Sequence, residues 1–214
     1  MRRLHGVDWA VIPDRIETAT FLIAGAITRS PITVSGGRPD HQLAVLDTLR
    51  QMGIEVRRSG NRMTIVPTER PRAAEIATLP YPAFPTDVQS PILALMAISQ
   101  GTSIITERIY PDRFMAAAEM KRLGANIAVS NGQAVIQGVE RLQGAPVMAS
   151  DLRAGAALVL AGLAASGQTR ISRIYHVERG YERFEERLRK LGAAISRVPE
   201  EAPEGTLAAE APCA

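Results

Sequence analysis

The sequence has little cysteine, histidine and aromatic content. Its single cysteine, Cys213, is one residue from the end of a 214-residue chain, which excludes an intrachain disulfide and a zinc cluster built from cysteines. The three histidines (His5, His41 and His176) are scattered, so we expect no histidine-rich metal site and no cofactor. Aromatic residues make up only 4% of the chain and basic residues form no run longer than two, which argues against a nucleic-acid partner.

Long hydrophobic runs are also missing. The longest stretch without a polar side chain, AGAALVLAGLAA at 154–165, has 12 residues, whereas a helix that crosses a membrane needs about 20. We therefore expect a buried helix there and no membrane partner. Met1-Arg2-Arg3 is similar to the start of a signal peptide, but Asp8 and Asp14 interrupt the apolar segment that would have to follow. These features favour a reducing, cytoplasmic location.

Charge is unevenly distributed along the chain. Four of the 22 acidic residues lie in positions 199–214, which hold three prolines and no basic residue. Because this acidic tail has no periodic apolar face, we expect it to be disordered. The rest of the chain has 18 acidic against 25 basic residues, which favours an anionic partner. Of the candidates, a nucleic acid, a membrane surface or a phosphorylated metabolite, we favour the small phosphorylated molecule.

The most informative feature is an internal repeat at a spacing of roughly 65 to 75 residues. Three segments each contain an apolar helix, then a strand, and then a second helix that ends in LRQMG, MKRLG or LRKLG. The glycines of these endings, Gly53, Gly124 and Gly192, stand where a helix end needs a left-handed residue. The second helices place apolar residues at spacings of three and four, which is typical of a helix packed on a sheet; examples are Leu43, Leu46 and Leu49, and Phe184, Leu188 and Leu191.

The repeat predicts three copies of one pattern around a common centre. Each unit is expected to run helix, strand, helix, strand, and the turn signals Ser59-Gly60-Asn61 and Ser130-Asn131-Gly132 add a hairpin strand to the first two. The last strand of the third unit is predicted at 193–198 (AAISRV). The first helices are apolar almost all round, so they are expected to be buried.

The expected organisation is therefore one α/β (α+β) domain at 10–198. Its repeats span about 11–67, 81–138 and 147–198, between an N-terminal extension at 1–9 and the acidic tail at 199–214. Trp9, in the extension, is expected to make a packing or junction contact.

Five segments carry a resemblance to a known family. They are VIPDRIETATFL, YPAFPTDVQSPILALM, ITERIYPDRFMAAAEMKRLGA, MASDLRAGAALVLAG and RIYHVERGYERFEERLRKLGA, and they cover nearly all of residues 10–198. In this order they closely resemble the C-terminal half of the UDP-N-acetylglucosamine enolpyruvyl transferases, within the enolpyruvyl transferase family. The resemblance implies a domain of three βαβαββ-type repeats around inward-facing helices, in effect half of an inside-out α/β barrel.

The same resemblance implies a reaction and shows what is missing from this chain. Members of the family move the enolpyruvyl group of phosphoenolpyruvate onto the 3-hydroxyl of UDP-N-acetylglucosamine, in peptidoglycan synthesis, at a cleft between two domains. The Lys-Asn pair, the arginine-rich phosphate clamp and the cysteine loop of the family's first domain match nothing in this sequence, and Cys213 lies outside every matching segment. The chain therefore resembles a second domain that is inactive alone and could need a first domain in trans.

Asp87, in FPTD, matches the residue that the family uses as candidate base for the hydroxyl. The alternative is a purely structural role as a helix N-cap, which is the role expected of Asp14 and Asp151 at the equivalent positions. Ser90 followed by Pro91 is a better N-cap and first-turn pair, which would leave Asp87 in the preceding turn, free to face a ligand.

Three arginines match family residues that line the cleft. Arg179, in HVERGYE, matches an arginine that contacts phosphoenolpyruvate and stands with Asp87 as a catalytic candidate. Arg113, in YPDRF, and Arg153, in SDLRA, match further cleft residues. The alternative for each is a solvated surface charge. Arg113 and Arg179 are expected to open second helices and Arg153 a first helix, where free backbone N–H groups attract anions.

Ile109, Tyr110 and Asp151 complete the expected substrate-binding set. Ile109 and Tyr110 match the segment that contacts the uridine end of the nucleotide sugar, and their alternative is a half-buried loop. Asp151 adjoins Arg153 and is a candidate both for the cleft and for a helix cap.

Three functions remain open from the sequence alone. The first is the transfer to UDP-N-acetylglucosamine, and the second is the sister reaction on 3-phosphoshikimate. The third is a non-catalytic anion-binding or interaction module. The segments FPTD, DLRAG and HVERGYER favour the first.

Overall fold

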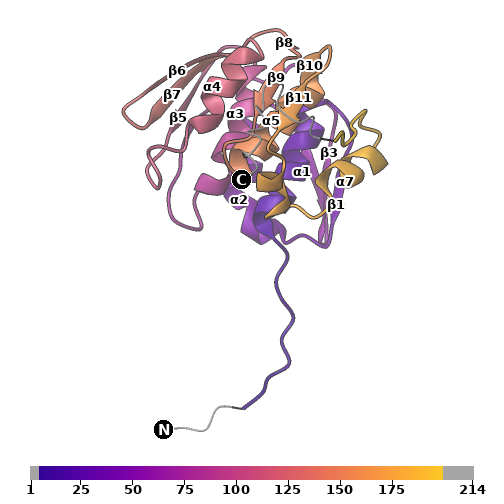
Figure 1. The fold of residues 1–214 in the computed structure, drawn as a ribbon. Helices are drawn as coiled ribbons and strands as arrows, with labels where there is room; N and C mark the ends of the chain where they lie inside the picture. Colours follow the sequence, from indigo (N-terminus) through magenta and orange to yellow (C-terminus); the bar gives the residue numbers. More distant parts are fainter. Residues whose placement is uncertain (1–4, 200–214) are drawn as a thin grey trace, which may run out of the picture.

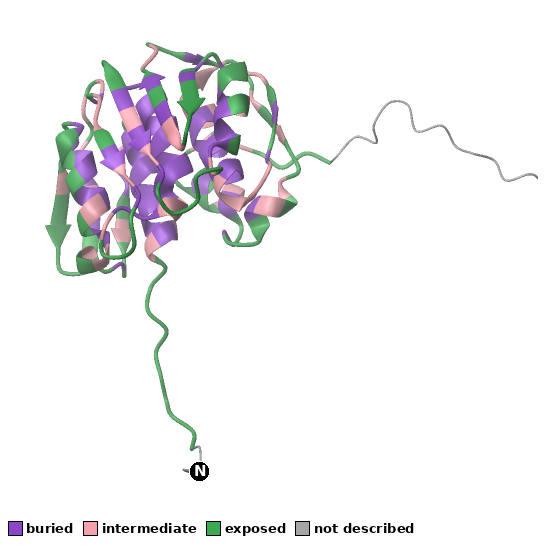
Figure 2. Cartoon of the chain, turned by 90° about the vertical axis from the view of Figure 1, so that its left-hand side faces the viewer, coloured by how far each residue is buried: buried purple, intermediate pink, exposed green. Residues whose placement is uncertain are grey.

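Three helices that are apolar on every face form the centre of the molecule. The computed structural model describes residues 5–199, and in it α1 (Arg15–Ile27), α3 (Gln89–Ala97) and α5 (Leu152–Ala164) pack against one another. Every residue of α3 is buried, and Figure 2 shows the buried residues concentrated on these helices. A helix that is apolar all round has no face to turn to water, so the rest of the chain must cover it.

The first unit covers α1 with a small antiparallel sheet. Its strands β1 (Thr33–Ser35), β2 (Val56–Ser59) and β3 (Arg62–Ile65) are ordered β1-β3-β2, so the last strand lies in the middle. Met63 and Ile65 of β3 are buried, and β3 contacts α1. A 3-10 turn, η1 (Pro39–Gln42), leads into α2 (Leu43–Gln51) between β1 and β2.

The second unit repeats this arrangement with one more strand. The order is β4 (Glu75–Ala77), β5 (Thr102–Thr106), β7 (Gln133–Gln137), β6 (Asn126–Ser130), with β4 parallel to β5 and the other pairs antiparallel. Helix α4 (Met115–Arg122) joins β5 to β6. Asn131 and Gly132 have φ angles of 49° and 70°, the left-handed pair that a tight hairpin needs, so this predicted turn is confirmed.

The third unit lacks the last strand that the sequence predicts. β9 (Pro146–Met148) pairs in parallel with β11 (Arg170–Ser172), and the short β8 (Leu142–Gln143) pairs with β10 (Ala165–Ser166). Helices α6 (Tyr175–Glu178) and α7 (Phe184–Lys190) follow, and Figure 1 shows β9, β11 and α5 close together. The predicted strand at 193–198 is wrong: these residues form no strand, because no described strand lies beside them to pair with.

The second helices end as predicted. Gly53, Gly124 and Gly192 follow α2, α4 and α7 with φ angles of 79°, 87° and 97°, where a side chain would be strained. The predicted stripe on α2 is confirmed at Leu46 and Leu49, which are buried, but Leu43 at the helix start is exposed.

Residues 5–14 precede α1 without helix or strand and extend away from the body of the molecule (Figures 1 and 2). Of the two contacts expected of Trp9, packing within the described residues is wrong, since its side chain is 80% exposed, and the junction contact stays a prediction. The acidic tail lies, apart from Pro199, outside the described residues. Within residues 5–199 no helix is long and apolar enough to span a membrane.

Aspartates fix the starts of α1 and α5. The Asp14 carboxylate accepts a hydrogen bond from the backbone N of Ile16 at 2.7 Å. The Asp151 carboxylate accepts from the backbone N of Arg153 at 2.8 Å and of Ala154 at 2.9 Å. Both aspartates are therefore N-caps, which satisfy N–H groups that have no partner inside the helix.

Helix α3 begins differently. A 3-10 turn, η2 (Thr86–Val88), runs directly into α3, and no side chain caps it. The predicted start at Ser90-Pro91 is wrong, because α3 begins at Gln89 and the Ser90 hydroxyl donates to the Gln89 side chain at 3.0 Å. The Asp87 carboxylate makes no capping bond and is left for other partners.

We expect Asp14→Ala and Asp151→Ala each to lower the free energy of unfolding by about 0.5 to 2 kcal/mol, as the loss of an N-cap does. Urea denaturation measures the effect. Asp47→Ala is the matched control, since Asp47 is exposed on α2 and contacts its helix neighbours Arg50 and Gln51, and an exposed ion pair of this kind contributes less than about 1 kcal/mol. Cap variants as stable as the parent protein would contradict the assignment.

Candidate functional site

Three predicted site residues meet at one point on the surface. The Asp87 carboxylate accepts a hydrogen bond from an Nη of Arg113, and the same Oδ1 lies 3.5 Å from Nε of Arg153. The Asp87 side chain is 36% exposed, against 21% for Arg113 and 18% for Arg153. One carboxylate therefore faces two partly buried guanidinium groups, which leaves a net positive charge.

Each of the three side chains is positioned by a different unit or segment. Asp87 projects from η2 in front of α3, and Arg153 lies in the first turn of α5, whose start Asp151 fixes. Arg113 lies just before α4, where its backbone N donates to the Tyr110 carbonyl at 2.9 Å and its guanidinium lies 5.5 Å from the centre of the Tyr110 ring. The buried Nε of Arg113 has no hydrogen-bond partner among the described residues, so this cation has unused donor capacity.

The two arginines set the ionisation of Asp87. Burial of the carboxyl by itself raises its pKa, but the hydrogen bond from Arg113 and the charge of Arg153 outweigh burial and hold the pKa of Asp87 below its usual value. Asp87 is therefore ionised at neutral pH. While both arginines stay paired with it, the carboxylate is also a weakened base.

The sequence analysis missed Tyr181, which lies behind Arg153. The Tyr181 ring is buried, its centre is 6.0 Å from the Arg153 guanidinium, and its hydroxyl is 2.9 Å from the Thr20 hydroxyl of α1. Burial raises the pKa of Tyr181, although the bond to Thr20 and the charge of Arg153 act the other way. The signal was present in HVERGYE, where an aromatic residue follows the arginine that drew attention.

Glu107 is a second residue that the sequence analysis missed. Its carboxylate is only 3% exposed and accepts hydrogen bonds from Thr78 Oγ1, from Thr86 Oγ1 at 3.0 Å, and from the backbone N of Ile109 at 2.9 Å and of Tyr110 at 3.0 Å. It thereby ties the loop at 107–110 to η2, next to Asp87. The signal is an acidic residue directly after the buried strand TSIIT.

Ile109 and Tyr110 are held on the surface by this buried anchor. Their side chains are 44% and 45% exposed, although Glu107 binds their backbone from beneath. The structure thus presents an aliphatic and an aromatic side chain beside Arg113.

Arg179 is not brought into the cluster. It lies exposed at the C-terminal end of α6, and α7 begins only at Phe184, after Arg183 in a left-handed conformation with φ of 46°. The expectation that Arg179 opens the second helix is therefore wrong, because the short helix α6 occupies that place. Asp151 is used by the cap of α5 and by the Ser150 hydroxyl, which donates to it at 3.1 Å.

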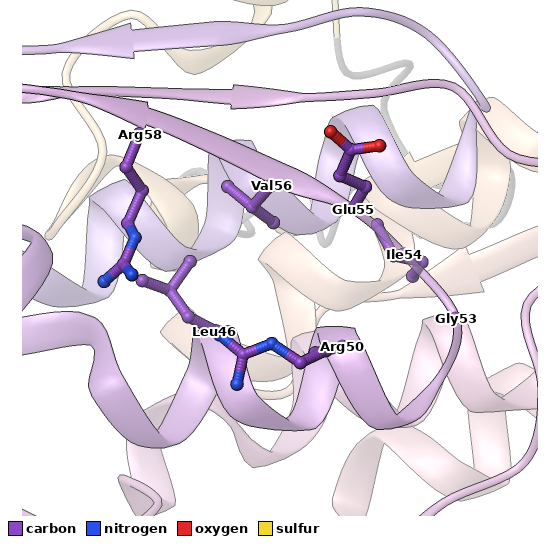
Figure 3. Close-up of a pocket in the computed structure, with 7 residues that line it drawn as sticks. All are labelled: Leu46, Arg50, Gly53, Ile54, Glu55, Val56 and Arg58. Carbon is purple, nitrogen blue, oxygen red and sulfur yellow. The ribbon is translucent and has the colours of Figure 1, made fainter.

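Two cavities lie away from the cluster. The smaller, of about 290 Å³, is lined by α2 and β2; in Figure 3 Arg50 and Arg58 reach toward Leu46 while Glu55 points to the opposite side. The larger, of about 740 Å³, lies against α5, β11 and residues 194–199. Neither is lined by Asp87, Arg113 or Arg153.

The pKa of Asp87 can be tested directly. Since it is lowered in the folded protein, the arginine contacts stabilise the fold fully above the unfolded-state value of about 3.9, and this contribution disappears as the pH falls through the lower folded-state pKa. We expect Arg113→Gln to raise the Asp87 pKa, because one of the two opposing cations is gone. Carboxyl 13C NMR follows the titration, with Arg50→Gln on α2 as control, and an unshifted Asp87 in Arg113→Gln would contradict the prediction.

Glu107 is expected to be a structural anchor. Glu107→Ala leaves two backbone N–H groups without their acceptor, and it should lower the free energy of unfolding by about 3 kcal/mol or more, since a hydrogen bond to a charged group contributes about 1.5 to 3 kcal/mol. Glu107→Gln keeps a carbonyl acceptor and should cost less. Urea denaturation measures both, with exposed Glu55→Ala as control; equal stability of Glu107→Ala and the control would refute the anchor.

Comparison with known proteins places this chain in a family. Residues 1–188 match the family model described as EPSP synthase (3-phosphoshikimate 1-carboxyvinyltransferase). UDP-N-acetylglucosamine 1-carboxyvinyltransferase 1 of Symbiobacterium thermophilum is 52% identical over 196 residues, which are 92% of this chain and 44% of the relative. UDP-N-acetylglucosamine 1-carboxyvinyltransferase of Desulfosudis oleivorans is 48% identical over 195 residues, 91% of this chain and 47% of the relative. The chain thus spans about half the length of the curated relatives it matches.

Solved structures of two enzymes share the fold of this chain. The enolpyruvyl transferase NikO from Streptomyces tendae matches with a TM-score of 0.77 and 32% identity, covering 86% of this chain and 44% of that one. EPSP synthase from Acinetobacter baumannii, at 19% identity and a TM-score of 0.60, shares the fold over 76% of this chain and 40% of its own. The predicted fold class is confirmed, and the chain belongs to the EPSP synthase family of enolpyruvyl transferases.

Proposed function

We propose that this chain supplies the second half of an enzyme that transfers the enolpyruvyl group of phosphoenolpyruvate to the 3-hydroxyl of UDP-N-acetylglucosamine, in peptidoglycan synthesis. The observation that carries the proposal is the meeting of Asp87, Arg113 and Arg153, in segments shared with relatives that bear the UDP-N-acetylglucosamine name at 48–52% identity. The near absence of cysteine favours the cytoplasm as the place of action.

The reaction needs a proton acceptor and stabilised negative charge. The sugar 3-oxygen forms a bond to C2 of phosphoenolpyruvate while C3 gains a proton; the adduct then loses a C3 proton, and the bond from C2 to the phosphate oxygen breaks to release phosphate. Asp87, being ionised, is suited to accept the hydroxyl proton. An anionic substrate that draws Arg113 away from Asp87 would raise the carboxyl pKa and so strengthen the base.

The cations suit the anionic groups of both substrates. Arg113 and Arg153 each present a guanidinium fork, which fits carboxylate and phosphate oxygens, and the unused Nε of Arg113 is one donor for such a group. Arg179, exposed at the end of α6, is proposed to reach the same phosphoenolpyruvate from a second side. The surface of Ile109 and Tyr110 is proposed to contact the uridine end, and Asp151 acts by fixing the loop that carries Arg153.

A specific observation also bears on the sister reaction. The matching family model carries the name of the 3-phosphoshikimate enzyme, but the solved enzyme of that name is only 19% identical, which supports the fold alone. The relatives near 50% identity therefore favour the amino-sugar substrate. A non-catalytic anion-binding module would keep the arginines but would have no use for the Asp87 carboxylate between them, since it weakens an anion site.

Activity is expected only when both halves are present, because catalysis needs all the groups held around one substrate. We expect no phosphate release from phosphoenolpyruvate and UDP-N-acetylglucosamine by this chain alone. Addition of the half of the Symbiobacterium thermophilum relative that this chain does not match should restore release, measured with a phosphate assay. With that half present, Asp87→Asn should lower turnover by about a hundredfold or more, the usual contribution of a general base.

The control is Asp47→Asn on the exposed face of α2, which should leave turnover unchanged. Turnover by the isolated chain, or full turnover by Asp87→Asn, would overturn the proposed assignment. Replacing the amino sugar by 3-phosphoshikimate in the same assay tests the sister reaction.

A further inference from the structure

The three central helices are held at their starts in two different ways. Asp14 and Asp151 cap α1 and α5 with their own carboxylates. Asp87 stands at the equivalent place before α3, but it makes no capping bond, and no described side chain caps that helix. Because a capping carboxylate is occupied by backbone N–H groups, a helix start whose aspartate faces a charge cluster must be held by other means.

Glu107 holds this helix start from outside. The Thr86 hydroxyl of η2, one residue before Asp87, donates to Oε2 of Glu107 at 3.0 Å. Glu107 follows strand β5 directly, and its backbone N donates to the Gly132 carbonyl of the neighbouring hairpin at 2.8 Å. The turn before α3 is thereby joined to the four-stranded sheet, and a sheet positions a site more precisely than a loop does.

The other oxygen of Glu107 holds the other side of the cluster. Oε1 accepts from the backbone N of Tyr110 at 3.0 Å, and the Tyr110 carbonyl accepts from the backbone N of Arg113 at 2.9 Å. The Arg113 guanidinium in turn donates to Asp87, the neighbour of Thr86. These contacts close a ring, so that both members of the Asp87–Arg113 pair are fixed relative to one carboxylate.

An acidic residue directly after the strand occurs at this position only in the second unit. Glu107 follows β5, whereas Gly36 follows β1 and Arg173 follows β11. Glu107 is only 3% exposed, and burying a carboxylate is costly unless its oxygens are hydrogen-bonded. The unit with this buried carboxylate is also the unit whose aspartate does not cap its helix, which indicates that the two features belong together.

We infer that Glu107 is a positioning residue for the charge cluster, which acts through Thr86 to fix Asp87 at the place where it meets Arg113; for its effect on turnover, the inference rests on the proposed function. The same carboxylate also holds the backbone of Ile109 and Tyr110, the surface proposed for the uridine end. The bond to Thr86 uses Oε2 and the bonds to the backbone use Oε1. The two tasks can therefore be separated.

A kinetic split tests the link through Thr86. Thr86→Val keeps the shape of the side chain and the Oε1 bonds but removes the donor to Oε2. With the unmatched half of the Symbiobacterium thermophilum relative present, kcat for phosphate release should fall about tenfold or more, because a small misplacement of a catalytic group is costly. KM for UDP-N-acetylglucosamine should change by less than about twofold, since the lost interaction serves the chemical step. Thr86→Ser keeps the donor and should keep kcat.

Thr48→Val is the matched control. It removes a buried hydroxyl of α2 that donates to the Ala44 carbonyl at 3.0 Å, and it should leave kcat and KM unchanged. Glu107→Gln separates positioning from proton transfer, since the amide keeps a carbonyl acceptor and offers an N–H to the Thr86 hydroxyl. It should therefore lower kcat less than Thr86→Val does, and complete loss of turnover in Glu107→Gln would overturn the positioning role.

A second readout needs only the chain itself. The charged side chains that face Asp87 are Arg113, before α4, and Arg153, on α5, and together they hold the pKa of Asp87 below its usual value. Thr86→Val should loosen the contact with Arg113 and raise the Asp87 pKa toward that value, as followed by carboxyl 13C NMR. Thr48→Val should leave the Asp87 pKa unchanged.

The outcomes separate this inference from the proposed function. An unchanged kcat or an unchanged Asp87 pKa in Thr86→Val would overturn the positioning role and leave the proposed function standing, as would a Thr86→Ser variant as slow as Thr86→Val. Absence of phosphate release by the parent chain with the added half would overturn the proposed function. The titration of Asp87 then decides the positioning role alone: a pKa raised in Thr86→Val but not in Thr48→Val supports it, and any other result overturns it.

Discussion

Three helices without a polar face are the constraint on which the rest of the structure depends. Fully burying a leucine, isoleucine or valine contributes about 1.5 to 3 kcal/mol, so each helix must be covered on all sides. Each unit meets this need with a sheet and an amphipathic helix, and the chain repeats even the turn by which that helix ends. The repeat is thus a solution to one packing problem, applied three times.

The packing of the central helices also brings the residues of the candidate site together. Because α3 and α5 lie side by side, the segments at their starts bring Asp87 against Arg153, and the loop before α4 adds Arg113. Asp14 and Asp151 cap α1 and α5, whereas Asp87 caps no helix, so its carboxylate is available for charge chemistry. The buried anchor Glu107 then holds the neighbouring loop against η2.

The features that the sequence predicts correctly are those that depend on residues close together in the sequence. Helix caps at Asp14 and Asp151, the glycine ends and the hairpin at Asn131-Gly132 depend on neighbouring residues, and they were predictable. The strand at 193–198 was not, because a strand needs a partner from elsewhere. Among the site residues, resemblance located Asp87, Arg113 and Arg153. Glu107 and Tyr181 act through partners that are distant in sequence, Thr86 for Glu107 and Thr20 for Tyr181, and the short local signals at these two residues do not identify those partners.

Tyr181 connects the groove beside β11 with the charge cluster of Asp87, Arg113 and Arg153. Its ring lines the groove beside β11 and also lies 6.0 Å from the guanidinium of Arg153, while its hydroxyl reaches Thr20 of α1 at 2.9 Å. The ring is buried and its hydroxyl is held by Thr20, so it gives the Arg153 guanidinium a fixed surface to lie against. Since a charged group at a binding site is most effective when it is held in place before the ligand arrives, the packing of Tyr181 also organises the charge cluster.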